Sequence, residues 1–219
     1  CRREFPDANI VRMDQDQTAG KNAHAKLLKE FRDHPRSILI GTQMIAKGHD
    51  FPRLTVAAVV AADQLLGRND IRAAEKAFQL VAQTAGRAGR KDLPGDVYIQ
   101  AFDIDHYALI TAAQHDYYAF VPQELSFRKT LNYPPYSVRG LIVISAEKDS
   151  WAKKEAWEIY SSLERLKTEG TIALQFLEPS PAGLYRIQGR WRWQIILSGD
   201  KVSGTKELSL LGQRLSLRK

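Results

Sequence analysis

The sequence predicts an α/β protein in which a parallel-sheet lobe is followed by a small α+β C-terminal domain. Two observations predict this fold class. Over the first hundred residues, apolar strand-like runs alternate with segments of helical spacing, which is typical of parallel strands connected by helices. The sequence Tyr133-Pro134-Pro135 then interrupts the pattern, because proline lacks an amide donor and favours an extended residue before it. We therefore expect a domain boundary at this point.

The elements of the first lobe follow in order. Strands are expected at residues 8–13, 37–41, 55–63 and 95–102, and helices at residues 20–34 and 73–85. The first helix has apolar residues at the spacing of one helix face, namely Ala23, Leu27, Leu28 and Phe31. The apolar run inside residues 55–63 is typical of a strand that is covered on both faces.

The second half gives a shorter pattern. Residues 105–131 are expected to be helical, with a second segment that starts at Pro122. We then expect strands at residues 138–145, 172–177 and 190–197. Helices are expected at 151–166 and 206–217, and a Pro/Gly loop at 178–189. This order is that of a ferredoxin-like sandwich without its last strand, which we expect beyond Lys219. The expected domains are residues 1–104, a helical connector at 105–133, and residues 134–219.

Composition and charge exclude several classes of protein. The chain is 44% hydrophobic and 26% charged, and no apolar run approaches the roughly 20 residues of a membrane-spanning helix. Cys1 is the single cysteine, so no intrachain disulfide and no Cys-based zinc site can form. The net charge is +7, and residues 131–219 carry 14 basic against 9 acidic side chains, which favours a polyanionic partner. Without an initiator Met or a leader, the chain is expected to be an intracellular piece of a longer protein.

A first stretch of chemical interest follows the strand expected at 37–41. Thr42 lies directly after this strand, and ligands of open α/β sheets bind at the carboxyl ends of strands. Six residues later Gly48 permits close backbone approach, and Asp50 adds a carboxylate near a proline. A helix cap followed by a turn explains the same residues, so this stretch alone leaves both interpretations open.

A second stretch, Gln83 to Arg90, ends the helix expected at 73–85. The pairs Gly86-Arg87 and Gly89-Arg90 place two guanidiniums three residues apart at a helix end. Arginine is permanently charged and offers a planar donor fork, which suits the charge on a transferring phosphoryl group. A solvated basic helix end is the alternative for this stretch alone, but the two stretches together are far more specific than either one.

Together these stretches resemble motifs V and VI of superfamily 2 helicases, which have the forms T-x5-G-x-D and Q-x2-G-R-x-G-R. The amino-acid sequence resembles that of the PriA-type replication-restart DNA helicase family over nearly the whole chain. The residues that carry this resemblance are 12–16, 40–52, 70–75, 83–90, 133–135, 178–182 and 189–194.

The resemblance implies the second RecA-like lobe and the C-terminal domain of an ATP-dependent 3′-to-5′ helicase. Such a protein recognises stalled or repaired replication forks and initiates primosome assembly. By motif position, the resemblance implies DNA contacts for Thr42, Gln43, Lys47 and Arg192, and ATP contacts for Gly48, Asp50, Arg87 and Arg90. Gln83 is expected to couple ATP to DNA, and Arg90 is the preferred arginine finger, with Arg87 beside it.

The cofactors implied by the resemblance are expected to depend on the rest of the protein. A phosphate-binding G-x4-G-K-[ST] loop is absent, since Gly20-Lys21 is followed by Asn22, and no adjacent Asp-Glu pair is present to hold Mg²⁺. ATP and Mg²⁺ are therefore expected mainly on the first lobe, and this fragment alone is expected to be inactive. Zinc is expected in the parent protein, with no ligands in this chain.

A strictly alternating strand, Arg190 to Ile195, marks the C-terminal domain. Alternation places Trp191, Trp193 and Ile195 on one face, where core packing is the preferred interpretation, and the donors Arg190, Arg192 and Gln194 on the other. Such a row of donors suits phosphates or an acidic peptide with a free carboxylate. The resemblance supplies both ligands, namely fork DNA and the acidic tail of single-stranded DNA-binding protein, with Arg190 and Gln194 expected for the tail. Tyr185 and Arg186 would extend this surface, and Lys153 and Lys154 are expected on a solvated helix face.

Two hypotheses follow from these patterns. The first is the helicase part described above, expected as a monomer in the bacterial cytoplasm or nucleoid, with forked and single-stranded DNA, single-stranded DNA-binding protein and primosome proteins as partners and no membrane. The second is a non-catalytic restart module that binds fork DNA or protein and has lost its ATPase activity. The paired arginines favour the first hypothesis, and the absent phosphate-binding loop keeps the second open.

Overall fold

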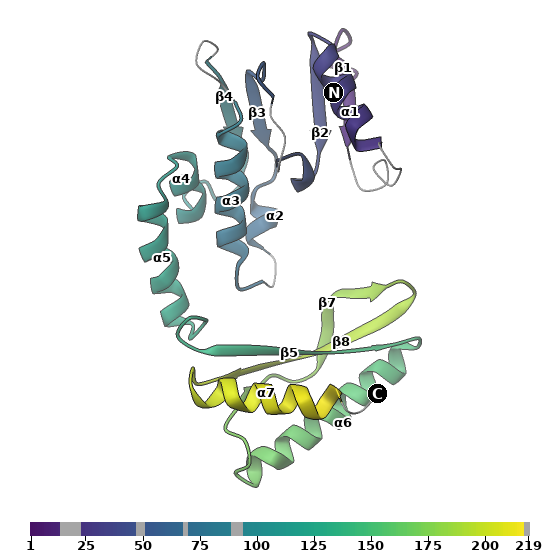
Figure 1. The fold of residues 1–219 in the computed structure, drawn as a ribbon, viewed down its shortest axis with the longest axis vertical. Coiled ribbons are helices and arrows are strands. Elements are labelled where there is room, and N and C mark those ends of the chain that lie inside the picture. The colour runs from purple at the N-terminus through teal and green to yellow at the C-terminus, as the bar shows by residue number, and fades with distance from the viewer. Residues whose placement is uncertain (14–22, 47–50, 68–69, 89–93, 217–219) are drawn as a thin grey trace. The chain divides into compact units, whose positions relative to one another are not determined.

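The computed structural model describes residues 1–13, 23–46, 51–67, 70–88 and 94–216. Their contacts divide the chain into two compact units, Cys1–Val121 and Pro122–Lys219 (Figure 1). The boundaries expected at residues 104 and 133 from the sequence remain predictions.

Two pairs of parallel strands form the first unit (Figure 1). Strand β1 (Asn9–Met13) pairs with β2 (Ser37–Gly41), and β3 (Val56–Val59) pairs with β4 (Asp96–Ile99). Helix α1 (Ala23–Asp33) packs on the first pair and α3 (Ala73–Ala85) packs on the second. The two short helices α2 (Asp63–Leu66) and α4 (Tyr107–Ala113) pack against α3. Parallel strands joined by helices agree with the α/β class predicted for this half.

Side chains of α3, α4 and the start of α5 (Tyr117–Thr130) build the larger core of the first unit. Phe78 and Phe120 stack with ring centroids 4.5 Å apart, and Val81 and Ala112 are fully enclosed beside them. A smaller cluster joins Met13 to Leu28 and Phe51 under β1 and β2. Each parallel pair therefore has its own apolar support.

Two predicted elements of the first unit are wrong in their limits. The strand expected at 55–63 ends at Val59, because Ala61 has a φ of 54° and the chain then enters α2 at Asp63. The expected helical break at Pro122 lies instead at His115, which has a φ of 54°. The Asp116 carboxylate accepts a 2.8 Å hydrogen bond from the Ala119 amide, so α5 begins there and continues through Pro122.

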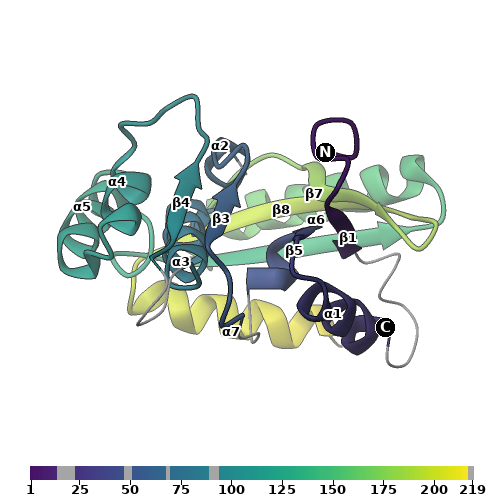
Figure 2. The same cartoon turned by 90° about the horizontal axis from the view of Figure 1, so that it is seen from above.

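An antiparallel sheet forms the second unit. Strand β8 (Arg190–Gly199) lies between β5 (Val138–Ala146) and β6 (Gln175–Phe176), and β7 (Ser180–Ile187) also pairs with β8. Helices α6 (Asp149–Thr168) and α7 (Ser203–Ser216) cover one face of this sheet (Figure 2). A strand inserted between the two strands of a βαβ unit is the ferredoxin-like arrangement predicted for this half.

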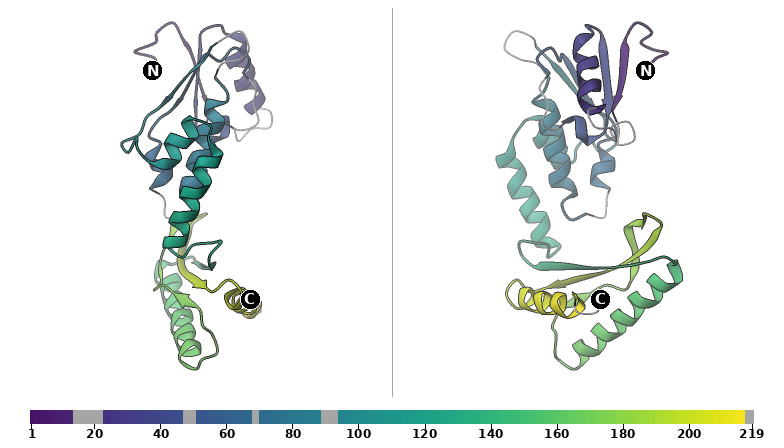
Figure 3. Two further views of the ribbon diagram at one scale, coloured as in Figure 1. Left: turned by 90° about the vertical axis from the view of Figure 1, so that its left-hand side faces the viewer. Right: turned by 45° about the vertical axis from the view of Figure 1, so that its right-hand side comes forward.

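The loop expected at 178–189 is wrong, since most of these residues form β7. Ser180 and Pro181 pair with Gln194 and Trp193, and after an irregularity Arg186 and Ile187 pair with Trp191 and Arg190. The turn residues Gln188 and Gly189 have φ values of 48° and 79°, the combination that a two-residue type I′ hairpin requires. The β7–β8 hairpin curves away from α7 (Figure 3), and its Tyr185 and Trp193 donate hydrogen bonds to Asp149 at the start of α6. The Pro and Gly content suggested a loop, but proline is compatible with an edge strand.

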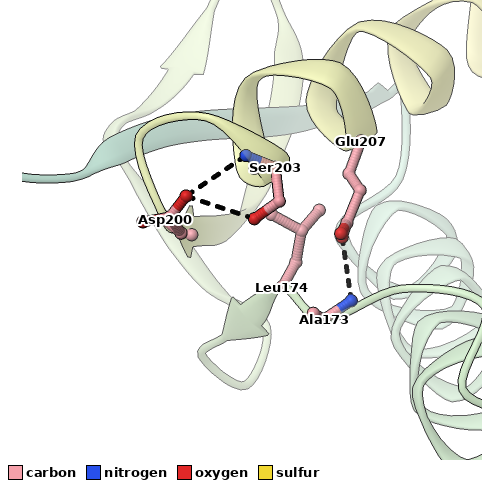
Figure 4. Close-up of a pocket in the computed structure, with 7 residues that line it drawn as sticks. Ala173, Leu174, Asp200, Ser203 and Glu207 are labelled. Carbon is pink, nitrogen blue, oxygen red and sulfur yellow. Dashed lines mark hydrogen bonds between the residues drawn. The ribbon is translucent and has the colours of Figure 1, made fainter.

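The start of α7 is fixed by two carboxylates (Figure 4). Asp200 Oδ1 accepts hydrogen bonds from the Val202 and Ser203 amides at 2.8 and 3.2 Å, which caps the helix and lowers the pKa of this carboxyl. Glu207 reaches from the next turn and accepts a 2.8 Å hydrogen bond from the Ala173 amide. Asp200 thus caps α7, and Glu207 holds the helix against the segment that leads into β6.

Candidate functional site

The first sequence motif begins where β2 ends. Gly41 lies opposite Met13 of β1, and a Cβ at this position would come within 2.5 Å of the Met13 carbonyl oxygen, so only glycine fits. Thr42 and Gln43 follow with exposed side chains. The Thr42 carbonyl accepts a 3.1 Å hydrogen bond from the Ile45 amide, which turns the chain into the short helix η1 (Gln43–Ala46). Both predicted DNA-contacting side chains are thus accessible at the carboxyl end of a parallel strand.

The second motif forms the end of α3. Gln83 is exposed in the last turn, and the Gly86 amide donates to the Ala82 carbonyl at 3.0 Å. Arg87 follows with a half-buried side chain, and its amide donates to the Thr84 carbonyl at 3.1 Å. These hydrogen bonds form a tight last turn of the helix. The side chains of Gln83 and Arg87 therefore both extend from the C-terminal end of α3.

Helix η1, in the first motif, packs against α3, the helix at whose end the second motif begins. Thr42 and Gln43 lie on or next to η1, and Gln83 and Arg87 lie on or next to α3. The remaining predicted residues of this site, Lys47, Gly48, Asp50 and Arg90, lie outside the described residues. Their roles stay predictions.

The sequence reasoning missed Asp63, which links the ends of two strands of the first unit. Its carboxylate accepts hydrogen bonds from the Phe102 amide at 2.8 Å and the Asp103 amide at 3.1 Å. These backbone donors lower the pKa of the Asp63 carboxyl. Asp63 therefore positions the segment after β4 against the segment after β3. An acidic residue in a first helical turn after an apolar strand was the available signal.

The row of donors predicted on the C-terminal strand is present. Arg190, Arg192 and Gln194 share one face of β8, and their side chains are exposed or half-buried. Arg190 donates to the Ser145 carbonyl at 2.8 Å, and Arg192 donates to the Leu184 carbonyl at 3.3 Å. Each guanidinium is thus held by a neighbouring strand and keeps further donors for a ligand.

The opposite face of β8 is only partly core. Trp193 and Ile195 are buried as predicted, whereas Trp191 is half-buried and its ring contacts that of Tyr185. Tyr185 and Arg186 were expected to extend the donor row, but the pairing of Arg186 with Trp191 places Arg186 on the tryptophan face instead. The expected core role of Trp191 and the expected position of Arg186 are therefore corrected.

A hydrogen-bonded carboxylate fixes this tryptophan face. Asp149, the first residue of α6, accepts hydrogen bonds from the Tyr185 hydroxyl at 2.6 Å and the Trp193 indole N–H at 2.8 Å. These donors lower the pKa of the Asp149 carboxyl, and the carboxylate raises the pKa of the Tyr185 hydroxyl. The same carboxylate thus connects α6, β7 and β8.

Neither a metal cluster nor a membrane helix is found in the described part of the chain. No three His, Cys, Asp or Glu side chains among the described residues gather in a way that could hold a metal ion. None of the described helices combines the length and apolarity needed to cross a membrane.

Comparison with known proteins places these units in a defined class. Residues 129–217 match the family model described as the primosomal protein N C-terminal domain, so the second unit has the sequence of a primosomal domain. Proteins named replication restart protein PriA match both units. The protein from Bacillus subtilis is 41% identical over 193 residues, which are 88% of this chain and 24% of the relative.

Two further relatives carry the same name. The protein from a Synechocystis species is 39% identical over 89% of this chain and 23% of its own length. That from Haemophilus influenzae is 37% identical over 88% of this chain and 26% of its own length. The chain therefore belongs to the PriA family, as a C-terminal fragment that spans about a quarter of the length of these relatives.

Proposed function

We propose that this chain supplies the second RecA-like lobe and the C-terminal domain of an ATP-dependent 3′-to-5′ DNA helicase that restarts replication at stalled or repaired forks. The observation that carries the proposal is the packing of η1, which begins the first motif, against α3, which carries the second. A turn that grips DNA and a helix end that contacts ATP must move together if hydrolysis is to drive movement along DNA. Direct contact between the two elements supports that coupling.

The roles of the site residues follow from their chemistry. Thr42 and Gln43 offer exposed hydroxyl and amide donors for DNA phosphates. Gln83 and Arg87 extend from the end of α3, and Arg87 has the permanent charge that suits the γ-phosphate. Lys47 is proposed as a further DNA contact, and Gly48, Asp50 and Arg90 as the remainder of the ATP surface, with Mg²⁺ held mainly by the first lobe.

The C-terminal unit is proposed to bind partners. Arg190 and Gln194 share one face of β8 and suit the carboxylates of the acidic tail of single-stranded DNA-binding protein. Arg192 lies between them on the same face and is proposed to contact forked or single-stranded DNA. Primosome proteins would join the same assembly, in which the helicase acts as a monomer in the bacterial cytoplasm, and zinc would be held elsewhere in the parent protein.

The test is DNA-stimulated ATP hydrolysis by the full-length protein that contains this chain. Arg87→Ala and Arg90→Ala are each expected to lower the rate, and loss of the finger residue is expected to cost about 10³-fold or more. Arg36→Ala is the control, because Arg36 is an exposed arginine of the first unit that lies outside the stretches that carry the resemblance. Full activity in both motif variants would contradict the proposal.

The second candidate function is a non-catalytic restart module. It is favoured by the concentration of positive charge in residues 131–219, which carry 14 basic and 9 acidic side chains. In that case wild-type full-length protein would bind forked DNA without hydrolysing ATP. The same experiment separates the two functions.

A further inference from the structure

The β7–β8 hairpin and the first turns of α6 form a linked group of aromatic and cationic side chains. We call it the aromatic–cation cluster and define it as Lys153, Tyr185, Arg186, Trp191 and Trp193, with Asp149 beneath. The Arg186 guanidinium lies 4.8 Å from the Trp191 ring centroid, and the Tyr185 and Trp191 ring centroids are 5.0 Å apart. The ammonium group of Lys153 lies 5.5 Å from the Trp193 ring centroid. Lys153, expected on a solvated helix face, therefore belongs to this cluster.

The cluster is held in a fixed arrangement from below. The Asp149 carboxylate accepts hydrogen bonds from Tyr185 and Trp193, so the rings cannot rotate freely. Trp193 is buried against Ala152 and Ala156 of α6. A surface whose rings are already ordered loses little conformational entropy when a ligand binds.

The cationic groups of the cluster remain available to a ligand. Among the described contacts, Arg186 makes no hydrogen bond or ion pair, whereas Arg190 and Arg192 donate to carbonyls of neighbouring strands. A guanidinium stacked on a ring directs its N–H groups outward in its own plane, where they can bind phosphate. Residues 179–199 contain three arginines and no Asp or Glu. Lys153 and Arg186 contribute two positive charges and Asp149 one negative charge, so the cluster has a net positive charge.

We propose that the aromatic–cation cluster is a second DNA-binding surface, which contacts backbone phosphates through Arg186 and Lys153. Ordered aromatic rings beside outward-directed cations are the combination by which proteins bind nucleic acid without reading its sequence. The cluster lies on the tryptophan face of β8, opposite the donor row of Arg190, Arg192 and Gln194. The inference rests on the proposed function in one respect, namely that the parent protein binds DNA.

The test uses the full-length protein, with binding measured by fluorescence anisotropy on a labelled oligonucleotide at several salt concentrations. Arg186→Ala is expected to weaken binding about tenfold, and Arg186→Ala with Lys153→Ala to weaken it further. Each lost phosphate contact is expected to lower the slope of log affinity against log salt by about 0.7 to 1. A single-stranded oligonucleotide and a duplex of the same length show which form of the backbone the cluster binds.

Arg190→Ala and Lys154→Ala are the matched controls. Arg190 belongs to the same hairpin but lies on the opposite face, and Lys154 is exposed on α6 and pairs with Glu158. Lys154→Ala is expected to leave DNA affinity and its salt slope unchanged. Arg190→Ala is expected to reduce binding of an acidic peptide that ends in a free carboxylate, with little change in the salt slope for DNA. Arg186→Ala is expected to leave peptide binding intact.

The outcomes separate the cluster from the wider proposal. If wild-type protein binds DNA and the Arg186 and Lys153 variants match it in affinity and salt slope, the cluster does not bind DNA. If wild-type protein binds neither oligonucleotide, the proposed function itself is overturned. Equal melting temperatures of variants and wild type exclude misfolding as the cause of any loss.

Discussion

In each of the two units, helices cover one face of a sheet and apolar side chains are exposed on the other face. The consequences for stability differ between an antiparallel and a parallel sheet. In the second unit α6 and α7 cover one face of an antiparallel sheet, and Leu141 and Val143 are exposed on the other. In the first unit α3 packs on the β3–β4 pair, and the opposite face exposes Val56, Val60 and Tyr98. Antiparallel sheets commonly have one solvated face, whereas parallel sheets are almost always covered on both faces. The second unit is therefore the more self-sufficient structure.

Separating the units tests this comparison and has the largest expected effect. Residues 122–219 alone are expected to unfold in one cooperative thermal transition with a dispersed NMR spectrum. Residues 1–121 alone are expected to show no sharp transition and to bind a hydrophobic dye, because the apolar face of β3–β4 is uncovered. The measurements are circular dichroism melting, dye fluorescence and NMR. A cooperative transition in residues 1–121 would remove the distinction.

Next in size is the loss of a core side chain from the second unit. Leu174 is fully buried in the cluster that joins α6, α7 and β8, so Leu174→Ala is expected to lower the free energy of unfolding by about 2 to 5 kcal/mol. Leu177, three residues later, is 61% exposed, and Leu177→Ala is expected to change it by only about 0.5 kcal/mol. Urea unfolding of residues 122–219 measures both. Equal losses in the two variants would mean that the core is not where the structure places it.

Substitution of three glycines by alanine tests how closely the backbone is packed in each of the two units. A Cβ at Gly204 would come within 3.0 Å of the Gly199 backbone, so Gly204→Ala is expected to separate α7 from β8 at a cost of about 1 to 3 kcal/mol. Gly212 in the same helix has no atom within 4 Å of such a Cβ, and Gly212→Ala is expected to stabilise the unit by about 0.5 to 1 kcal/mol. In the first unit, a Cβ at Gly86 would make only ordinary contacts, the nearest at 3.5 Å. Gly86→Ala is expected to leave folding intact.

The melting temperatures of the full-length variants test this series. A lower value for Gly212→Ala than for Gly204→Ala would contradict it. A stable Gly86→Ala protein that loses ATP hydrolysis would show that this glycine serves a ligand or another part of the protein, because a Cβ there meets only ordinary contacts among the described residues.

Regular elements were predicted most successfully where a periodic pattern coincided with strong end signals. The strand at 37–41 and the helix at 73–85 have the predicted limits, since Gly41 and Gly86 each follow or end a clear apolar pattern. The limits failed where a single residue with positive φ decided them. Ala61 and His115 have left-handed backbones, which are uncommon for alanine and occur in only a minority of histidines, so neither residue type indicated the break.

The candidate sites show the same division. Local alternation correctly placed Arg190, Arg192 and Gln194 on one face of β8, because a strand has a strict period of two. The contact between η1 and α3, the pairing of Arg186 with Trp191 and the bonds of Asp149 join residues far apart in the sequence. Such contacts depend on register and packing, which a single sequence does not determine.

The smallest expected effect concerns the carboxylate that joins α6 to the hairpin. Hydrogen bonds from Tyr185 and Trp193 lower the pKa of Asp149 in the folded protein. A folded pKa below the unfolded value means that the ionised carboxylate adds stability above the unfolded pKa, near 3.9, and that this contribution is lost as pH falls through the folded pKa. Asp149→Asn keeps an acceptor for both donors but has no charge.

We therefore expect the Asp149→Asn variant to melt slightly below wild type at neutral pH, and the difference in melting temperature to shrink as pH falls below about 4. Melting of residues 122–219 between pH 7 and pH 2 measures this. A difference that stays constant with pH would show that the charge of Asp149 does not stabilise the second unit, and would leave packing as the basis of its greater self-sufficiency.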